Sequence, residues 1–407
     1  MTLRDLVSAW MRFWFAPVSP VPLALLRIAV GLLTLQTALV LVGKDVLDWY
    51  GYHGVCPPED IAAYWWHGAP HFDLLELLPH NDSAVLAFWY VFVAAVVCMT
   101  VGLFTRYATI VVAISLLSLN NRMPLNLNGG DSLLRLYAVY LCFSECGAVI
   151  SLDRLIQRWR HPTIGEASRP RAVPILVQRL IQLQISLAYA GSVLLKLTGH
   201  EWLDGTAVYY ALRLQELVRF SIPALTDNLL ANKFLTAYTL LAEGAMFTVI
   251  WIRELRYWAL GAVLLLHIGI DTLMMLPFFQ WIFICGLVTF VYPEDLTTLM
   301  AWVKHRIEHY LGPPVSLLYN PQSRRQLSTA SVIEGLDIFG RLTITSHEAG
   351  EPMAILKGDK KETGTAMVAS LSAALPLLWP VFPFARISEA LTPGRPAQQI
   401  DDGKSSK

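Results

Sequence analysis

The chain has 407 residues, of which 55% are hydrophobic and only 15% are charged, and its mean hydropathy is +0.48. Soluble globular domains carry about 25% charged residues, so this composition predicts an integral membrane protein with the lipid bilayer as its first partner. The 31 basic and 31 acidic residues balance without a Lys/Arg-rich block, so no nucleic-acid partner is expected. The five cysteines form no C-x-x-C pair, and no metal site is predicted.

Residues 1–20 predict an amphipathic helix that lies on the membrane surface. The apolar residues of one helical face are Leu3, Leu6, Val7, Trp10 and Trp14, and the polar residues opposite are Arg4, Asp5 and Ser8. The segment lacks the small-residue cleavage site of a signal peptide and is followed directly by a long apolar run. We therefore expect it to remain in the mature protein.

Apolar runs that suit a hydrocarbon core of about 30 Å predict an all-α polytopic membrane bundle. The eight predicted spans are 22–42, 84–104, 107–121, 132–150, 174–198, 234–252, 257–277 and 279–294. The third and the eighth are the shortest.

The arginines between the spans predict the orientation of the bundle. They are Arg106, Arg154, Arg158, Arg160, Arg169, Arg171, Arg253 and Arg256, and helix parity places all of them on one side. The loop 43–83 holds one lysine, Lys44, and seven acidic residues. Because cytoplasmic loops are enriched in Lys and Arg, we expect a multi-pass protein of the inner or plasma membrane with both termini in the cytoplasm.

The composition changes after residue 295, where a second region begins. Residues 296–312 predict an amphipathic connecting helix, and residues 313–390 predict a small α/β domain. Within that domain "MAILKGDKKETG" is typical of a hairpin that turns at Gly358 and Asp359. The polar tail 391–407 is predicted to be disordered, and 21–295 is taken as the membrane domain.

Charged and titratable groups within the predicted spans are candidates for function, because burying charge in a bilayer is costly. They are Arg27, Arg135, Glu145, Lys196, Glu243, His267 and Asp271. The alternative is that several of them pair to hold helices together, and Arg135 and Glu145 are assigned that structural role.

The depth of these groups predicts an outward-facing pocket. Lys196 lies at the outer end of its span, and an apolar pocket disfavours the charged form of a lysine, which then acts as a base. Lys196 and Asp131 are the predicted catalytic residues. The predicted substrate-binding residues at the same level are Asn128, Gly129, Gly130, His200, Trp202, His267 and Asp271.

Lys196 and Asp131 each have an alternative interpretation without a catalytic role. Lys196 is close enough to its helix end to extend its amine into interfacial water. Asp131 and its neighbours also suit a cap at the start of the fourth span, and the adjacent glycines allow close backbone approach.

Four segments resemble the HTTM family, which is related to the membrane part of vitamin K-dependent γ-carboxylase. They are "LLRIAVGLL" at 25–33, "NLNGGDSLLRL" at 126–136, "ISLD" at 150–153 and "QLQISLAYAGSVLLKLTGHEWLDGTAVYY" at 182–210. The resemblance implies that Lys196 is the base that deprotonates a hydroquinone, with Trp202 close behind it. The resemblance allows two cofactors, a quinone or a vitamin K-like hydroquinone. The chain has no counterpart of the large luminal domain of the carboxylase.

Residues 315–387 resemble a DCC-type thiol-disulfide oxidoreductase, a small thioredoxin-like domain. The resemblance rests on "LLYNPQSRRQLS", "LDIFGRLTI" and "LPLLWPVFPFARI". Polar residues around Ser323 and Gln326 replace the two cysteines of that family. Because a thiolate is the nucleophile of disulfide exchange, the resemblance implies a degenerate domain that docks and does not exchange disulfides.

Two functions from different classes follow. The first is a membrane enzyme that uses Lys196 as a base on a lipid-soluble, quinone-like small molecule. The second is a non-catalytic membrane factor for the maturation or export of a membrane or secreted partner protein. A transporter is disfavoured because no inverted repeat is found.

Overall fold

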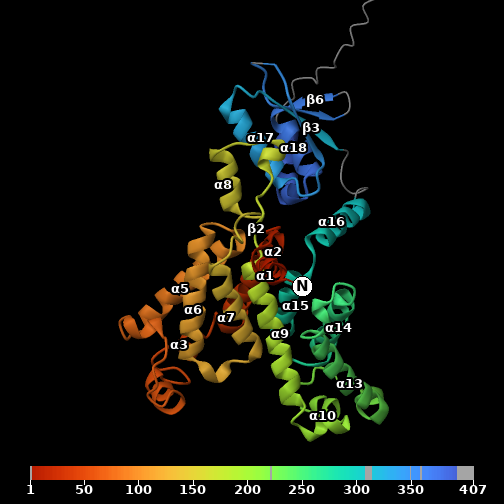
Figure 1. Cartoon of the computed structure of the whole chain (residues 1–407). Coiled ribbons are helices and arrows are strands. Elements are labelled where there is room, and N and C mark those ends of the chain that lie inside the picture. Colours follow the sequence, from red (N-terminus) through yellow and green to blue (C-terminus); the bar gives the residue numbers. More distant parts are fainter. Residues whose placement is uncertain (1, 221, 308–313, 349, 358–359, 392–407) are drawn as a thin grey trace, which may run out of the picture. The chain divides into compact units, whose positions relative to one another are not determined.

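The computed structural model describes residues 2–220, 222–307, 314–348, 350–357 and 360–391. The chain divides into two compact units, each described here by itself. Unit 1 comprises residues 1–151 and 172–291, and unit 2 comprises residues 152–171 and 292–407. Unit 1 is helical apart from a two-residue ladder, and unit 2 contains a small mixed sheet (Figure 1).

Unit 1 begins with the amphipathic helix α1 (Leu3–Phe15), none of whose residues is buried. Thr2 and Asp5 close its first turn reciprocally, since the side chain of each accepts a hydrogen bond from the backbone N–H of the other. The short strand β1 (Pro17–Val18) follows and pairs antiparallel with β2 (Val173–Pro174), just before α9.

The remaining helices of unit 1 follow in chain order. They are α2 (Val21–Gln36) with the π-helical turn η1 (Thr37–Val42), α3 (Val46–Tyr50), α4 (Pro58–Asp60), η2 (Ile61–Trp65), η3 (Leu74–Leu77), α5 (Asp82–Val101), α6 (Thr105–Arg122), η4 (Pro124–Asn126), α7 (Gly129–Cys142), α9 (Leu176–Lys196), α10 (His200–Asp204), α11 (Ala207–Ala211), α12 (Pro223–Thr226), α13 (Leu229–Ala245), η6 (Val249–Trp251), α14 (Arg256–Leu273), α15 (Phe279–Leu287) and η7 (Val288–Phe290). Helices α2, α5, α6 and α7 pack successively and bury one continuous apolar core.

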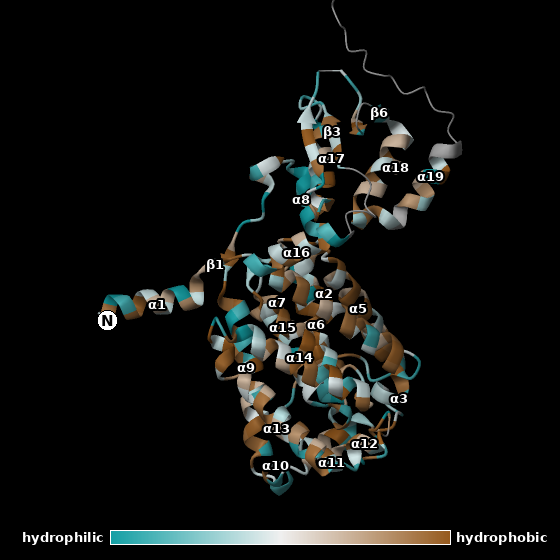
Figure 2. Cartoon of the chain, turned by 90° about the vertical axis from the view of Figure 1, so that its right-hand side faces the viewer, coloured by the Kyte–Doolittle hydropathy of each residue, from teal (hydrophilic) through white to brown (hydrophobic). Residues whose placement is uncertain are grey.

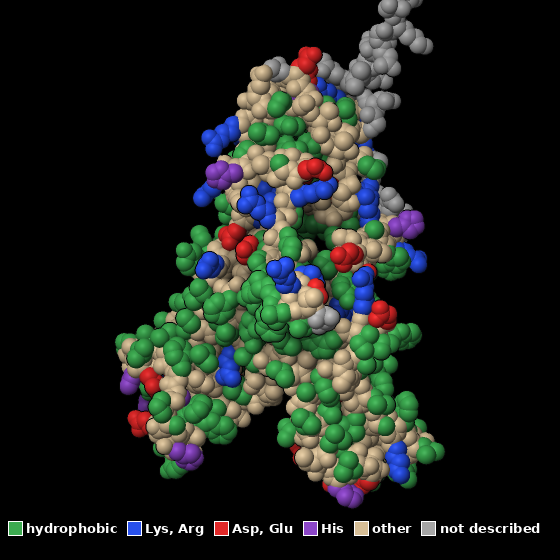
Figure 3. Space-filling model, in the orientation of Figure 1, with side chains coloured by type: hydrophobic (Ala, Val, Ile, Leu, Met, Phe, Trp, Pro, Cys, Tyr) green, Lys and Arg blue, Asp and Glu red, His purple; other side chains and the backbone are tan. Residues whose placement is uncertain are grey.

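The surface of unit 1 is unusually apolar. Leu187, Leu194 and Leu195 of α9 are 66–74% exposed, and Trp258 of α14 is 79% exposed. Figure 2 colours much of the ribbon of these helices as hydrophobic, and the space-filling view in Figure 3 shows many hydrophobic side chains on the visible face. Large apolar side chains that face outwards in such numbers suit a surrounding of lipid rather than water.

Two helices of the described residues are long and apolar enough to cross a membrane. They are Val21–Val42 and Asp82–Val101, and a third span results if Phe279–Phe290 and Pro293–Arg306 form one broken helix. The structure therefore supports a helical unit with membrane-type helices, but it does not establish the predicted number of eight spans. The other predicted spans correspond to helices that are shorter than the apolar runs in the sequence or that carry more polar residues.

The fourth predicted span, 132–150, shows why. Helix α7 ends at Cys142, and residues 143–151 form turns. Arg27 of α2 is fully buried and donates hydrogen bonds to the carbonyl oxygens of Cys146 (2.8 Å) and Ile150 (2.5 Å). These contacts satisfy backbone oxygens outside any helix, so the apolar run does not need to be helical throughout.

Unit 2 contains a four-stranded sheet in the order β4-β3-β5-β6. Strands β3 (Val315–Tyr319) and β4 (Leu342–Ser346) are parallel and joined by α17 (Arg324–Leu336), whereas β5 (Ala354–Lys357) and β6 (Lys360–Thr363) form an antiparallel hairpin. The remaining elements are α8 (Leu152–Arg160), η5 (Gly165–Ser168), α16 (Pro293–Ile307), α18 (Gly364–Ala374), η8 (Pro376–Val381) and α19 (Phe382–Leu391). The predicted turn at Gly358 and Asp359 and the tail 392–407 lie outside the described residues.

The segment 152–171 belongs to unit 2 although it follows α7 in the chain. Arg158 of α8 donates to the carbonyl oxygen of Ser331 (2.9 Å) and to the carboxylate of Glu334 (3.0 Å), both on α17. Its other terminal nitrogen donates to the carbonyl oxygen of Ser168 (3.1 Å). One buried guanidinium thus joins the early segment to the C-terminal sheet domain.

Candidate functional site

Helix α9 carries a stripe of polar side chains along one face. The residues recur at intervals of three or four and are Gln178, Gln182, Ser186, Tyr189, Ser192 and Lys196. A helix repeats every 3.6 residues, so this spacing keeps all six on the same side. The first four are buried, whereas Lys196 at the helix end is partly exposed.

The first half of the stripe has a structural role. The side-chain amides of Gln178 and Gln182 both donate to the carbonyl oxygen of Thr289, at 2.6 and 2.5 Å. The hydroxyl of Ser186 donates to the carbonyl oxygen of Met246 (2.8 Å), the residue that caps the end of α13. Carbonyls at helix ends lack partners within the helix, so these side chains supply the hydrogen bonds that lipid cannot.

The middle of the stripe forms a buried hydrogen-bonded chain. The hydroxyl of Tyr189 lies 2.5 Å from Nε2 of His267 on α14, and Nδ1 of His267 contacts the side-chain oxygen of Gln280 on α15. Because an amide oxygen only accepts hydrogen bonds, Nδ1 of His267 donates to Gln280, and a neutral ring then accepts at Nε2 from the hydroxyl of Tyr189. These contacts fix the orientation of Tyr189 and His267 on the face of α9 that also carries Lys196.

The end of the stripe is an ion pair. The Nζ atom of Lys196 lies 2.6 Å from both carboxylate oxygens of Glu243 on α13, and 2.7 Å from the hydroxyl oxygen of Ser192. Ser192 in turn donates to Glu243 at 3.1 Å. The side chains of Lys196 and Glu243 are 21% and 10% exposed, so the pair is shielded but still accessible from the side of the lysine.

Trp202 completes this group, which we call the Lys196 cluster (Tyr189, Ser192, Lys196, Trp202, Glu243, His267 and Gln280). The Nζ atom lies 5.1 Å from the centre of the indole ring, within the range of a cation–π interaction. Lys196 and Trp202, both predicted from the sequence, are therefore brought together, and the predicted His267 contacts Tyr189 on the same face of α9.

The structure places Asn128 and Asp131 elsewhere. The side-chain oxygen of Asn128 accepts from the backbone N–H groups of Gly130 (2.7 Å) and Asp131 (3.2 Å), and the carboxylate of Asp131 accepts from the N–H of Asn128 (2.9 Å). This is the helix cap of the alternative interpretation. Gly129 and Gly130 form the first turn of α7, and a Cβ on Gly130 would lie 3.1 Å from the ring of Phe279. None of the hydrogen bonds of the described residues links this cap to Lys196.

The remaining predicted residues lie at the periphery. His200 is 86% exposed and pairs with Asp204 at 3.1 Å within α10. Hydrogen bonds from Thr206 hold the pKa of Asp204 below its ordinary value, so this carboxylate stays charged beside His200. Asp271 lies one helical turn beyond His267 on α14 and is half-buried.

The sequence interpretation omitted Tyr189, Ser192, Glu243 and Gln280 from the candidate site. Tyr189 and Ser192 precede Lys196 by seven and four residues, so helical spacing was the signal that could have found them. Glu243 was recognised as a charged group within a span, but its partner depends on how α13 packs against α9.

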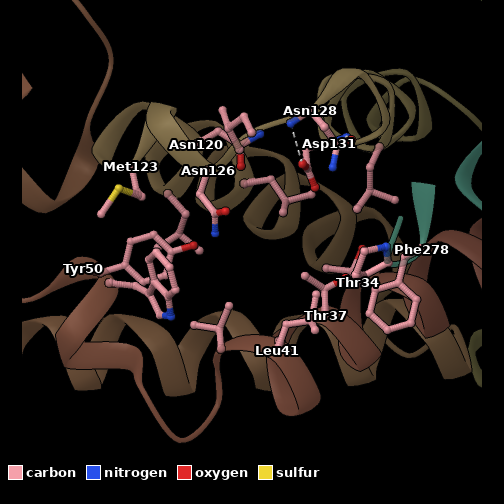
Figure 4. A pocket seen from close by; sticks show the side chains of 18 of the residues that line it. Thr34, Thr37, Leu41, Tyr50, Asn120, Met123, Asn126, Asn128, Asp131 and Phe278 are labelled. Carbon is pink, nitrogen blue, oxygen red and sulfur yellow. Dashed lines mark hydrogen bonds between the residues drawn. The ribbon is translucent and has the colours of Figure 1, made fainter. Parts of the chain in front are cut away.

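The cap of α7 borders a separate cavity of about 350 Å³ (Figure 4). Its lining comes from α2 and η1, α3, α5, α6, the segment 123–134, and Pro277 and Phe278 before α15. Lys196, Glu243 and His267 do not line it. Unit 1 therefore presents two candidate sites, the Lys196 cluster and this cavity.

Comparison with known proteins gives one match, to a protein family. The family model described as the HTTM domain matches residues 15–294, which is more than half of the chain and includes both candidate sites. No curated protein and no solved structure matches the chain. The chain therefore belongs to the HTTM domain family.

Proposed function

We propose that this protein is a membrane enzyme, related to γ-carboxylase, in which Lys196 removes a proton from the hydroxyl group of a lipid-soluble, quinol-like substrate. The observation that carries the proposal is the arrangement of Lys196, Glu243 and Ser192. The Lys196 amine is held in a fixed place by two anchored groups, yet keeps one accessible side against Trp202.

The pair offers a route to a neutral amine. Transfer of one proton from Lys196 to Glu243 converts two buried charges into two neutral groups, which a low-dielectric setting favours. The free amine then accepts the proton of a substrate O–H group, leaving the substrate as an oxyanion and Lys196 as an ammonium ion. That ammonium ion, beside Glu243, stabilises the new negative charge.

A short-chain naphthoquinol tests this step in protein embedded in lipid nanodiscs. Deprotonated quinol reacts with oxygen faster than neutral quinol, passing two electrons to O₂ to give the quinone and hydrogen peroxide. Wild-type protein is expected to increase oxygen uptake over protein-free nanodiscs. Lys196→Arg is expected to remove the increase, because a guanidinium keeps the ion pair but does not become a neutral base.

The matched control is Lys233→Arg, which changes an exposed lysine of α13 and should leave oxygen uptake unchanged. The unfolding midpoint of Lys196→Arg is measured alongside, since the pair with Glu243 is retained and the fold should persist. Undiminished oxygen uptake by a folded Lys196→Arg variant would show that the pair is structural and that Lys196 is not the base.

We also propose that the chain is multi-pass with both termini cytoplasmic, on the basis of the arginine distribution. Single cysteines are introduced at Asp60 and Gly165 after the five native cysteines are replaced. A membrane-impermeant maleimide is expected to label position 60 in intact cells and position 165 only after lysis. The reverse pattern would invert the topology.

Unit 2 is proposed to be a thioredoxin-like domain without redox activity. The strand order β4-β3-β5-β6, with β3 and β4 parallel and the hairpin antiparallel, supports this fold. At the start of α17, Ser323 is the N-cap, while the side chain of Gln326 accepts from the N–H of Asn320 (2.8 Å) and donates to the carbonyl oxygen of Glu351 (3.0 Å). Hydrogen bonds thus occupy the place where that family has thiols.

A further inference from the structure

The cavity beside the cap of α7 has one wall of polar side chains and other walls of apolar side chains. Amide and hydroxyl side chains gather around the hollow in Figure 4, with Asn120, Asn126 and Asp131 on one side and Thr34 and Thr37 on another. The volume of about 350 Å³ lies within the range of roughly 300–1,000 Å³ that is common for small-molecule sites.

Several polar groups of this wall lack partners. Asn120 is only 8% exposed, yet within the described part of the chain its side-chain amide makes no hydrogen bond. The hydroxyl of Tyr50, which is half-buried, also makes none within that part, whereas Asn126 is exposed and can bond to solvent. Buried amides are nearly always hydrogen-bonded, so groups that face a cavity without partners indicate a ligand or water that supplies them.

The charge of the lining limits that ligand. Among the residues that the structure describes, no Lys, Arg or His lines the cavity, so no basic side chain there compensates an anionic group. The one acidic residue, Asp131, has a carboxylate oxygen bonded to the N–H of Asn128 and lies at the positive end of the α7 dipole. Burial outweighs these contacts and raises the pKa of Asp131, so the carboxyl group does not require a cationic ligand.

The donor and acceptor groups limit it further. The buried amide of Asn120 offers N–H donors and an oxygen acceptor, the hydroxyl of Tyr50 offers both functions, and the second carboxyl oxygen of Asp131 is another acceptor. A ligand must therefore donate hydrogen bonds as well as accept them. Hydroxyl groups do both, whereas the carbonyl oxygens of an oxidised quinone only accept.

The other walls are aromatic and aliphatic. Trp49, Tyr50 and Trp89 provide flat surfaces, and the aliphatic residues of the lining are Leu41, Val42, Leu116, Leu119, Met123 and Leu134. Aromatic faces pack well on the C–H surface of a ring, and the aliphatic wall suits an apolar body. We infer that the cavity binds an uncharged amphiphile with a polyhydroxylated ring, the sugar head group of a glycolipid.

Equilibrium binding of tritiated octyl β-glucoside, below its critical micelle concentration, tests this inference in phosphatidylcholine nanodiscs. Saturable binding above the level of empty nanodiscs is expected. Asn120→Leu should weaken it by about two- to tenfold, the factor that one hydrogen bond between neutral groups contributes. The matched control is Asn121→Leu, because the neighbouring amide donates to the carbonyl oxygen of Phe72 and does not line the cavity.

Competition identifies the chemical class. Unlabelled octyl glucoside should displace the label, whereas octanol and octylphosphocholine at the same concentration should not. Displacement by glucose at equal concentration would overturn the lipid part of the inference. Displacement by octanol, or stronger displacement by decylubiquinone, would overturn the sugar part.

A second variant protects against a folding artefact. Leu41→Trp fills the cavity from η1 at a position that is 44% exposed, and it should also abolish saturable binding. Unchanged affinity in both Asn120→Leu and Leu41→Trp would exclude this cavity as the site. The result is independent of oxygen uptake from naphthoquinol, so either proposal can fail alone.

Discussion

Lys196→Met alone is expected to lower the free energy of unfolding by about 3–5 kcal/mol, the usual loss when one partner of a buried ion pair is removed. Glu243 is then left 10% exposed, without its cation and with only the hydroxyl of Ser192 as a side-chain donor. Denaturant titration of the purified protein measures the change.

The double variant Lys196→Met/Glu243→Leu is expected to recover most of that loss, because it removes both charges together. Glu243→Leu alone completes the double-mutant cycle, and the coupling energy is the informative quantity. If the Lys196→Met variant were as stable as wild type, the amine would be extending into water and the ion pair would contribute nothing.

Gly102→Ala is the second substitution with a large expected effect. Gly102 caps α5 with φ of +71°, and an added Cβ would lie 2.4 Å from Cβ of Ser151 and 2.8 Å from a guanidinium nitrogen of Arg27. The left-handed backbone costs an alanine about 1–2 kcal/mol, and overpacking typically adds about 1–3 kcal/mol. The unfolding free energy should fall by the sum, and melting curves report it.

Gly68→Ala separates these two causes. Gly68 has nearly the same φ, +73°, but an added Cβ there would meet nothing within 4 Å. It should therefore show the backbone cost only. Equal losses at Gly68 and Gly102 would mean that the structure relaxes around Arg27 without penalty, and that this contact does not fix the turn after α5.

Features of the fold that depend on neighbouring residues were predicted from the sequence more reliably than features that depend on residues far apart in the chain. The cap formed by Asn128 and Asp131 depends on four consecutive residues, and the structure contains it. The end of α7 at Cys142 was missed because it depends on Arg27, which lies 119 residues from the carbonyl it contacts. Apolar content alone does not reveal where such a side chain replaces a helical hydrogen bond.

The candidate site shows the same division. Depth in the membrane could be counted along each apolar run, so Lys196, His267 and Trp202 were placed at one level. The direction in which each helix faces depends on packing between α9, α13 and α14, so the pairing of Lys196 with Glu243 was not predicted. The cavity was also missed, because its walls come from six separate segments that the sequence does not relate to one another.

The contact of Arg158 with α17 has a consequence for synthesis of the chain. The ribosome adds 176 residues between Arg158 and Glu334. At about 5–20 residues per second, α8 waits on the order of 10–35 seconds for the carboxylate and carbonyl that its guanidinium binds. During that interval the guanidinium lacks both partners on α17, and of its three contacts only the carbonyl oxygen of Ser168 lies in the segment already synthesised. The contact that joins the two segments of unit 2 therefore forms only after α17 has been synthesised.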